Sequence, residues 1–127
     1  MSDSIFETTI KGLEMGLQVQ HIATLDQDVS TCQIDDRRDL SEIFADPQFH
    51  GFDQIPIREG KSIIGVVLKE STGKIADDLH RLNISNIISA SDPLTHLIPL
   101  MAETSYCLVL QRGTIVGIVT RSDLLKL

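Results

Sequence analysis

Two stretches of this chain carry the same pattern of apolar residues around a single glycine. Ser62–Ser71 and Thr114–Asp123 align without a gap, and Gly65 falls opposite Gly117. In both places the pattern indicates a strand that follows a shorter strand and a turn, with a helix on either side. Each half then has the order β-α-β-β-α and is too small to bury its own sheet. The sequence therefore predicts an α/β (α+β) module in which two repeats pack pseudo-symmetrically.

The composition fits such a module and excludes a nucleic-acid binder. Hydrophobic residues make up 42% of the 127 residues, but there are only four Phe, one Tyr and no Trp, so Ile, Leu and Val must form the core. A chain with so few aromatic rings is poor at stacking single-stranded bases. Its net charge of -7 also repels phosphate backbones. We expect no nucleic-acid partner.

The sequence shows no signal for export, no membrane span and no metal-binding pattern. Met1–Ser4 lacks the basic start of a signal peptide, and no apolar stretch has the length of a membrane span, so we expect a cytoplasmic protein. Cys32 and Cys107 lie in apolar, strand-like stretches and are predicted to be buried, reduced thiols. The four histidines lie in separate segments without a partner at ligand spacing, so no metal site is predicted.

The expected organisation is an N-terminal amphipathic helix within residues 1–16, a first repeat over 17–82 and a second over 83–127. Val19 to Thr24 and Val29 to Ile34 are predicted to be extended. Hairpins are expected over 54–68 and 106–120. Helices are expected after Asp35 and Asp36, over 72–82, after Ser91 or Asp92 with Pro93 at the first position, and from Ser122 onward.

The second repeat resembles a known family. Val116–Leu125 fits a Gly-apolar-x-Thr-x-x-Asp pattern at Gly117, Thr120 and Asp123, and Ile87–Leu94 resembles the matching first strand and helix start. These residues, at the end of a repeated hairpin, resemble those of cystathionine-β-synthase (CBS) domains, which occur as pairs called Bateman modules. The resemblance covers about Leu17 to Leu127 and implies the fold that the repeat predicts.

The resemblance also implies a ligand. Thr120 and Asp123 are three residues apart at a strand-to-helix junction, so both side chains can face one point, and a carboxylate there can accept hydrogen bonds from two ribose hydroxyls. A helix N-terminus suits a phosphate. CBS pairs are implied to bind adenine nucleotides or related adenosyl compounds, such as S-adenosylmethionine, between their halves. Further implied contacts come from Ile87 or Ile88 and from Tyr106 or Cys107, with Arg121 as the nearest cation for a phosphate.

Another interpretation of the same residues stays open. Thr120 and Asp123 also form an ordinary helix-capping arrangement, and Arg121 is also consistent with a solvated surface residue. The first repeat has Leu68 and Ser71 in place of the Thr and Asp. A leucine cannot hydrogen-bond a ribose, so we expect at most one nucleotide site per chain.

Two functions follow from these patterns. The first is a non-catalytic regulatory module that binds an adenosyl ligand, forms a homodimer and signals to a partner protein by conformational change. Apolar faces around Ile75–Leu79 and Leu94–Ile98 would then serve the dimer contact. The alternative is a ligand-free dimerisation or interaction module whose site has decayed. A third function, that of a small enzyme, lacks support, because the sequence shows no set of nucleophile, base and perturbed carboxylate.

Overall fold

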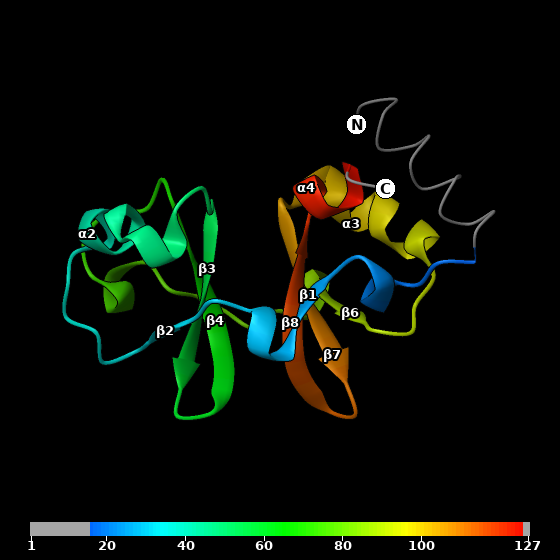
Figure 1. Ribbon diagram of the computed structural model, residues 1–127, viewed down its shortest axis with the longest axis horizontal. Helices are drawn as coiled ribbons and strands as arrows, with labels where there is room; N and C mark the ends of the chain where they lie inside the picture. Colours follow the sequence, from blue (N-terminus) through cyan, green and yellow to red (C-terminus); the bar gives the residue numbers. More distant parts are fainter. Residues whose placement is uncertain (1–15, 126–127) are drawn as a thin grey trace. The chain divides into compact units, whose positions relative to one another are not determined.

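The chain consists of two compact units, seen in a computed structural model that describes residues 16–125 (Figure 1). The central unit spans Val29–Leu82. The terminal unit combines the described residues up to Asp28 with those from Asn83 onward. Each unit holds one four-stranded sheet, which confirms the mixed α/β class. The helix expected within residues 1–16 lies, apart from Gly16, outside the described residues.

The sheet of the central unit has the order β2-β3-β4-β5. β2 and β3 are parallel, whereas β3–β4 and β4–β5 are antiparallel. Its strands are β2 (Cys32–Gln33), β3 (Gln54–Glu59), β4 (Ser62–Leu68) and β5 (His80–Arg81). The expected hairpin over 54–68 is therefore confirmed, and Gly60 takes a φ of +62° at its turn.

The sheet of the terminal unit has the order β1-β8-β7-β6. β6 and β7 are parallel, whereas β7–β8 and β8–β1 are antiparallel. Its strands are β1 (Thr24–Leu25), β6 (Ile87–Ser89), β7 (Tyr106–Gln111) and β8 (Thr114–Thr120). Arg112 and Gly113 form the turn of the second hairpin with φ values of +53° and +77°, as a two-residue type I′ turn requires.

The two sheets match strand for strand if β6-β7-β8-β1 is laid over β2-β3-β4-β5. All three pairings then agree in direction, and both hairpins have a register shift at the same place, between Ile57 and Arg58 and between Val109 and Leu110. The fourth strand differs in origin. The central unit takes β5 from the chain that follows its hairpin, whereas the terminal unit takes β1 from far upstream. Residues 17–28, which we expected in the first repeat, thus complete the sheet of the second.

Each hairpin contains a glycine because the fourth strand comes very close to it. A Cβ atom on Gly65 would lie 2.5 Å from the carbonyl oxygen of His80, and one on Gly117 would lie 2.2 Å from that of Thr24. Real side chains do not make such contacts, so only glycine lets β5 and β1 pair at these positions. The glycine shared by the two repeats is explained by the same packing in both.

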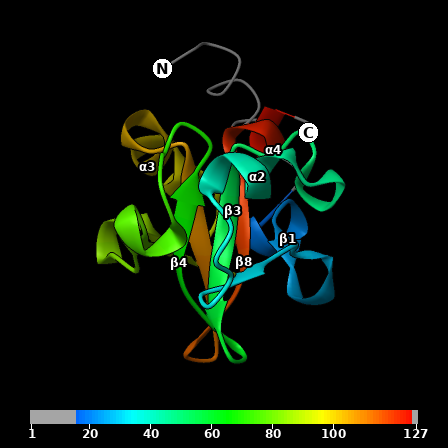
Figure 2. The same ribbon diagram turned by 90° about the vertical axis from the view of Figure 1, so that its left-hand side faces the viewer.

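The helices cover one face of each sheet. In the central unit, α2 (Leu40–Ala45) lies in front of β3 in Figure 2 and packs Leu40 and Ile43 into the core. In the terminal unit, α3 (Leu97–Glu103) and α4 (Arg121–Leu125) cover the sheet. The fully buried side chains of these cores are mostly Leu, Ile and Val, with Met101 and Phe49 among them, as the composition predicts.

Three predicted elements differ from the structure. The helix expected over 72–82 is wrong: Gly73 has a φ of +88°, and the Asp77 carboxylate accepts the backbone N–H of Lys74 at 2.8 Å. These features limit the segment to one 3₁₀ turn, Ile75–Asp77, before β5. Val19–His21 is also a 3₁₀ turn rather than extended chain.

The third difference concerns where helices begin. α2 begins at Leu40 rather than after Asp36, because the Asp36 carboxylate binds Arg38 instead of capping a helix. Pro93 precedes a 3₁₀ turn, Leu94–His96, that continues into α3. Pro99 is tolerated in the first turn of α3, where a backbone N–H needs no helical partner.

The apolar faces expected to form a dimer contact are buried in part, although Leu79 and Ile98 remain half-buried. Ile75 is 1% exposed, and Leu94 and Leu97 are fully buried within their own units. Large apolar side chains that are exposed among the described residues lie elsewhere: Phe52, Leu82, Ile84 and Leu125. No helix within residues 16–125 is long and apolar enough to cross a bilayer.

Candidate functional site

The junction between β8 and α4 holds the two polar residues of the sequence pattern, Thr120 and Asp123. Asp123 Oδ2 accepts the backbone N–H of Thr120 at 2.9 Å and the Thr120 hydroxyl at 3.2 Å. In return, the backbone N–H of Asp123 approaches Thr120 Oγ1 at 3.4 Å. The two side chains do face one point, as expected, and at that point they bind each other. The helix start is thus capped by its own residues.

This arrangement leaves no anion site at the start of α4. The helix has only five residues, so its dipole is small. A carboxylate already lies at its N-terminus. The junction instead offers half-buried hydroxyl and carboxylate oxygens. Its chemistry favours hydroxyl and amine donors over phosphate.

The remaining expected contacts divide between the two faces of the sheet. Tyr106 pairs directly with Thr120 across the hairpin, and Ile87 pairs with Leu108 on the neighbouring strand. Since side chains alternate along a strand, Tyr106, Thr120 and Ile87 share the face that α3 and α4 do not cover. The structure therefore brings these three side chains to one side of the sheet.

Two other candidates point the opposite way. Ile88 and Cys107 belong to the core beneath the helices, and the Cys107 side chain is fully buried. Burial raises the pKa of the Cys107 thiol to about 11, so this thiol stays protonated and unreactive. Both side chains stabilise the core rather than face the Thr120 side. The prediction of a buried, reduced thiol is confirmed.

Gly117 and Arg121 have packing roles in this structure. Gly117 lies where β1 pairs with β8, too close to β1 for any side chain. The Arg121 guanidinium donates from Nε to the carbonyl oxygen of Met101 at 2.9 Å, and Nη2 donates to the same oxygen. Arg121 thereby ties the end of β8 to α3, and a cation near the C-terminus of a helix also complements its dipole.

One residue near this face was missed by the sequence reasoning. Asn86 shares a hydrogen bond with the Tyr106 side chain, whose pKa is nevertheless raised, mainly because the ring is buried. Asn86 ends the 3₁₀ turn Ile84–Asn86 just before β6. Nothing in the local sequence distinguished it, because its partner is twenty residues away and comes close only through the β6–β7 pairing.

The central unit has no comparable junction. Leu68 and Ser71 stand where the terminal unit has Thr120 and Asp123, and the backbone N–H of Ser71 bonds the Leu68 carbonyl in a simple turn at 3.0 Å. No α-helix follows β4 in the central unit, only the 3₁₀ turn Ile75–Asp77. The expectation that the first repeat lacks the nucleotide motif thus rests on a difference in backbone as well as in side chains.

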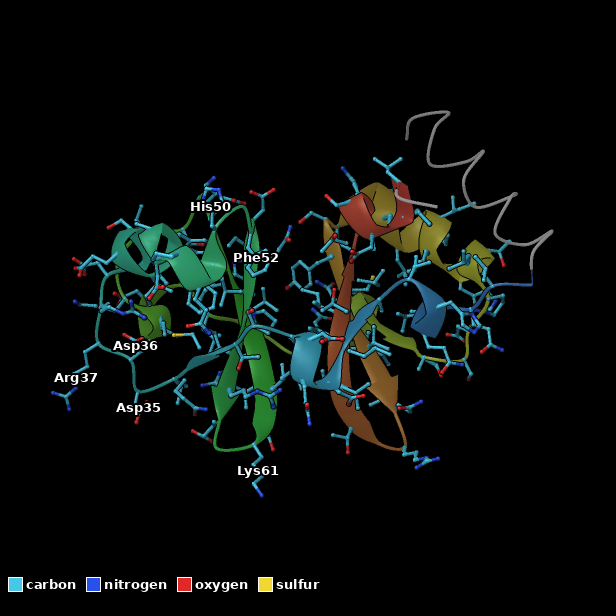
Figure 3. All side chains as sticks on the ribbon, viewed as in Figure 1. Asp35, Asp36, Arg37, His50, Phe52 and Lys61 are labelled. Carbon is cyan, nitrogen blue, oxygen red and sulfur yellow. The ribbon has the colours of Figure 1, made fainter. Side chains whose placement is uncertain are left out.

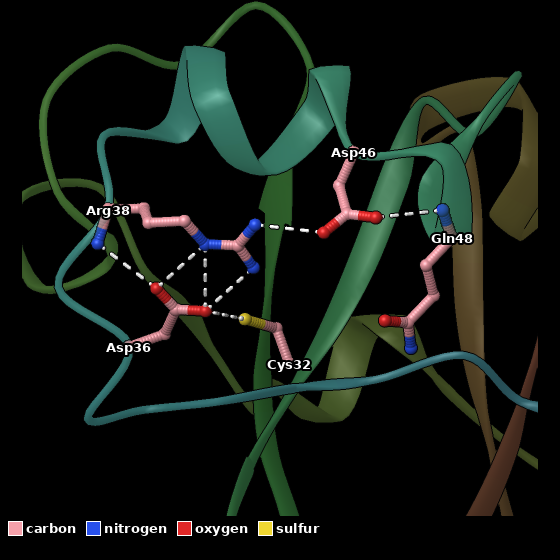
Figure 4. A network of polar contacts seen from close by, with 5 residues as sticks. All are labelled: Cys32, Asp36, Arg38, Asp46 and Gln48. Atoms are coloured by element: carbon pink, nitrogen blue, oxygen red, sulfur yellow. Dashed lines mark hydrogen bonds and ion pairs between the residues drawn. The ribbon is translucent and has the colours of Figure 1, made fainter.

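The central unit instead has a polar network around Arg38 (Figure 4). Nη2 of Arg38 lies 2.9 Å from Asp36 Oδ2, and its Nη1 lies 2.9 Å from Asp46 Oδ2. The Cys32 thiol donates to Asp36 Oδ2 at 3.3 Å. In the same stretch the side chains of Asp35 and Arg37 are exposed and extend outward in Figure 3, as does Lys61 at the hairpin tip.

This network shifts the pKa values of its members. Hydrogen bonds from Arg38 hold the pKa of Asp36 and of Asp46 well below the usual range for a carboxyl. Burial and the hydrogen bond to Asp36 raise the pKa of the Cys32 thiol to about 11. The polar groups of this network hydrogen-bond one another. The network therefore stabilises the connection between β2 and α2.

Metal chemistry finds no support in this part of the chain. Among residues 16–125, no cluster of three or more His, Cys, Asp or Glu side chains could hold an ion. The described histidines that meet a carboxylate do so on the surface, as His96 does with Asp92 at 3.6 Å.

Comparison with known proteins finds a family similarity in the second half of the chain. The sequence profile of the CBS domain matches residues 85–127, which include the β7–β8 hairpin and the Thr120–Asp123 junction. This part of the chain, about a third of its length, is similar to a CBS domain. A search of curated protein sequences found no match.

Solved CBS structures share the fold over both units. The CBS domain of a bacterial CNNM/CorC family Mg²⁺ transporter in complex with ATP has a TM-score of 0.71 at 17% identity, covering 94% of each chain. CBSX2 in complex with AMP has a TM-score of 0.67 at 16% identity, covering 87% of this chain and 95% of the other. The CBS domain pair of MJ0100, with 5′-methylthioadenosine and S-adenosyl-L-methionine, has a TM-score of 0.66 at 19% identity, covering 87% and 98%. These TM-scores show a shared fold.

Proposed function

We propose that this protein is a non-catalytic regulatory module that binds an adenosyl ligand beside Thr120 and Asp123. The observation that carries the proposal is the β8–α4 junction, where a hydroxyl and a carboxylate lie together at the end of a strand. Tyr106 lies opposite Thr120 on the same face. A carboxylate there accepts the hydrogen bonds that a ribose diol donates.

The fold supports the same ligand class. Solved CBS structures similar to this one are complexes with ATP, with AMP, or with 5′-methylthioadenosine and S-adenosyl-L-methionine. An adenosyl group is the part that all these ligands share. On this proposal, Ile87 and Tyr106 provide apolar contacts for the base, while Asp123 and Thr120 fix the ribose.

The regulatory step would be a change in population. A ligand that binds one arrangement of the chain better than another shifts the equilibrium toward it, and a partner protein reads the result. We further propose that the chain acts in the cytoplasm as a homodimer. Equilibrium sedimentation tests the dimer: a single species of twice the chain mass supports it, and a monomer across micromolar concentrations contradicts it.

A second function is favoured by a specific observation. Thr120 and Asp123 already bind each other, Arg121 binds Met101, and Gly117 lies beneath β1. Each residue of the motif therefore has a structural task that needs no ligand. This supports the alternative of a dimerisation or interaction module whose ligand site has decayed.

Thermal unfolding with AMP, ADP, ATP and S-adenosylmethionine separates the two functions. A ligand at a hundred times its dissociation constant adds about 2.7 kcal/mol to the free energy of unfolding, which is easily seen in a protein of this size. Stabilisation by an adenosyl ligand supports the sensor. No stabilisation by any of the four, in a folded protein, supports the interaction module.

The site is tested with Asp123→Asn, which keeps an oxygen for the Thr120 N–H while removing the charge. We expect ligand stabilisation to fall strongly and the ligand-free melting temperature to change little. Asp26→Asn is the matched control, because it removes the same charge from an exposed position in the same unit. Its positive φ of 52° also suits asparagine. Equal loss in both variants would contradict a site at Asp123.

A further inference from the structure

Residues 17–25, here called the strap, are separated in sequence from the rest of the terminal unit. After the strap the chain enters the central unit at Val29, and it returns to the terminal unit only at Asn83. The strap nevertheless fills part of the terminal core with one fully buried and several partly buried apolar side chains: Val19, Leu17, Ile22, Ala23 and Leu25. The terminal core is therefore complete only when the strap is in place.

Backbone hydrogen bonds hold both ends of the strap. Near its start, the N–H groups of Val19 and Gln20 donate to the carbonyl oxygens of Asp92 and Ala90, each at 2.9 Å. At its end, β1 pairs with β8, beside which it lies in Figure 1, at the position that only Gly117 can occupy. All of these partners belong to the terminal unit, so the docking site of the strap does too.

The three residues after the strap form a hinge. Asp26, Gln27 and Asp28 make a single 3₁₀ turn, and all three side chains are exposed. Asp26 has a φ of +52°, a left-handed conformation that is unfavourable for residues other than glycine. The strap therefore reaches its own terminal unit through a turn that is strained and buries no side chain.

A second copy of the chain offers the strap the same docking site. When the hinge extends, the strap can leave its own terminal unit and bind that of another copy, with every contact and hydrogen bond to that unit kept. The closed and exchanged forms then differ in two terms. Extension removes the positive φ of Asp26, and association costs entropy that matters less as the protein concentration rises.

We propose that two copies of this chain exchange their straps, so that β1 of one copy completes the terminal sheet of the other. The partner copy then contributes the strand beside β8, which is the strand that ends at Thr120. The inference rests on the homodimer of the proposed function, because it states how that dimer is held together. It does not depend on which ligand the protein binds.

Introduced cysteines show which copy a strap binds. Thr24 and Ile118 face each other in the pairing of β1 with β8. A Thr24→Cys chain and an Ile118→Cys chain can therefore form a disulfide only when the strap of the first docks on the second. The two chains are mixed, unfolded, refolded together at about 0.2 mM and oxidised. We expect a disulfide-linked pair on a denaturing, non-reducing gel.

Two features of the chain keep this signal specific. The native Cys32 and Cys107 are buried, and burial raises the pKa of both thiols to about 11, so they do not compete. Thr24→Cys mixed with Thr114→Cys is the matched control, because Thr114 is exposed on the same strand but pairs with Gln111. We expect no linked pair from this mixture.

One chain that carries both Thr24→Cys and Ile118→Cys gives the complementary result. Exchanged straps link two chains, whereas closed straps link each chain only to itself. A disulfide within single chains, together with no linked pair in the mixed sample, would overturn the exchange. If Ile118→Cys fails to fold, Gln18→Cys with Pro93→Cys repeats the experiment at the other end of the strap, where these two residues form a bridge.

Variants of the hinge change the balance in opposite directions. Asp26→Gly takes a positive φ without strain and should lower the association constant of the dimer about threefold or more, whereas Asp26→Val should raise it by a similar factor. Gln27→Gly is the control, because it adds a glycine where φ is not positive. Sedimentation equilibrium measures all three. Equal effects of the two glycine variants would contradict strain at Asp26 as the cause of exchange.

The outcomes separate this inference from the proposed function. A dimer with disulfide-linked pairs supports both the homodimer and the exchange. A species of twice the chain mass whose disulfides form only within single chains overturns the exchange and leaves the homodimer intact. A monomer at every concentration overturns the homodimer and the exchange together, while the adenosyl ligand is tested separately by thermal unfolding.

Discussion

The two units of this protein share a backbone plan but use it for different chemistry. After β2 and after β6 the chain turns in the same way: the N–H of Asp36 bonds the Gln33 carbonyl at 3.1 Å, and the N–H of Asp92 bonds that of Ser89 at 3.1 Å. Two residues later the central unit has Arg38, whereas the terminal unit has Leu94.

That single difference decides how each turn is stabilised. Leu94 is fully buried in the core beneath α3. The Arg38 side chain remains 39% exposed and joins Asp36 to Asp46. At the other end of the hairpin the contrast reverses, because the terminal unit has the polar Thr120–Asp123 pair and the central unit has Leu68. Arg38 in the central unit and the Thr120–Asp123 pair in the terminal unit thus lie at opposite ends of the same plan.

The largest effect is expected when Arg38 and Leu94, the residues that distinguish the two turns, are exchanged. Leu94→Arg would place a charge without a partner in the fully buried core and should lower the free energy of unfolding by about 3–5 kcal/mol. Urea denaturation followed by circular dichroism measures this loss. Arg38→Leu makes the opposite exchange at an exposed position and should have a much smaller effect. If Leu94→Arg were as stable as the natural chain, the residue at this position would not account for the difference between the two turns.

The next largest effect is expected at the two shared glycines. Gly117→Ala and Gly65→Ala each force a Cβ against the backbone of a paired strand, at 2.2 Å and 2.5 Å. We expect each substitution to cost about 2–3 kcal/mol, since backbone must move to relieve the contact. Thermal unfolding measures both, with Thr114→Ala at the exposed start of β8 as the control. A neutral Gly117→Ala would mean that β1 does not pair with β8.

A smaller difference is expected between the two ends of the hairpins. Asp123→Ala removes a helix cap and should lower the free energy of unfolding by about 1 kcal/mol. Ser71→Ala, at the matching place in the central unit, should change it by less than about 0.5 kcal/mol, because no helix begins there. Chemical denaturation of both variants provides the measurement. Equal effects would show that the Asp123 bonds do not stabilise the junction.

The smallest effect concerns pH and the network of the central unit. Asp36 and Asp46 have a lowered pKa in the folded state, so their contribution is present above the unfolded carboxyl pKa of about 3.9 and is lost as the pH falls below it. The urea midpoint should therefore fall between pH 5 and pH 3 partly through this network. Arg38→Leu should flatten that dependence. An unchanged pH profile in this variant would exclude the network as its source.

Much of the fold could be predicted because its signals are local. The two hairpins follow from apolar runs around short turns, and the repeat follows from the match of Ser62–Ser71 with Thr114–Asp123. The error over 72–82 occurred because a backbone conformation, a side-chain cap and a strand pairing override the helical spacing there. The spacing over 72–82 is helical, but no long helix forms there. Gly73 has a left-handed backbone, Asp77 caps a short turn, and β5 pairs with β4.

The candidate site was predictable in part for the same reason. The spacing of Thr120 and Asp123 indicated that their side chains meet, and they do. The commitment of Arg121 to Met101 and the hydrogen bond of Asn86 to Tyr106 involve residues far apart in the chain. No spacing within a short motif contains that information.

The sequence by itself determined the repeat, the hairpins, the residue types of the cores and the meeting of Thr120 with Asp123. These features depend on periodicity and on neighbours within a few residues. Only the tertiary structure decided that β1 completes the second sheet, that the shared glycine makes room for a fourth strand, and that Arg121 bonds the carbonyl of Met101. The reason is physical: close approach and hydrogen bonding between distant segments depend on where the folded backbone places them, and a linear pattern does not record that placement.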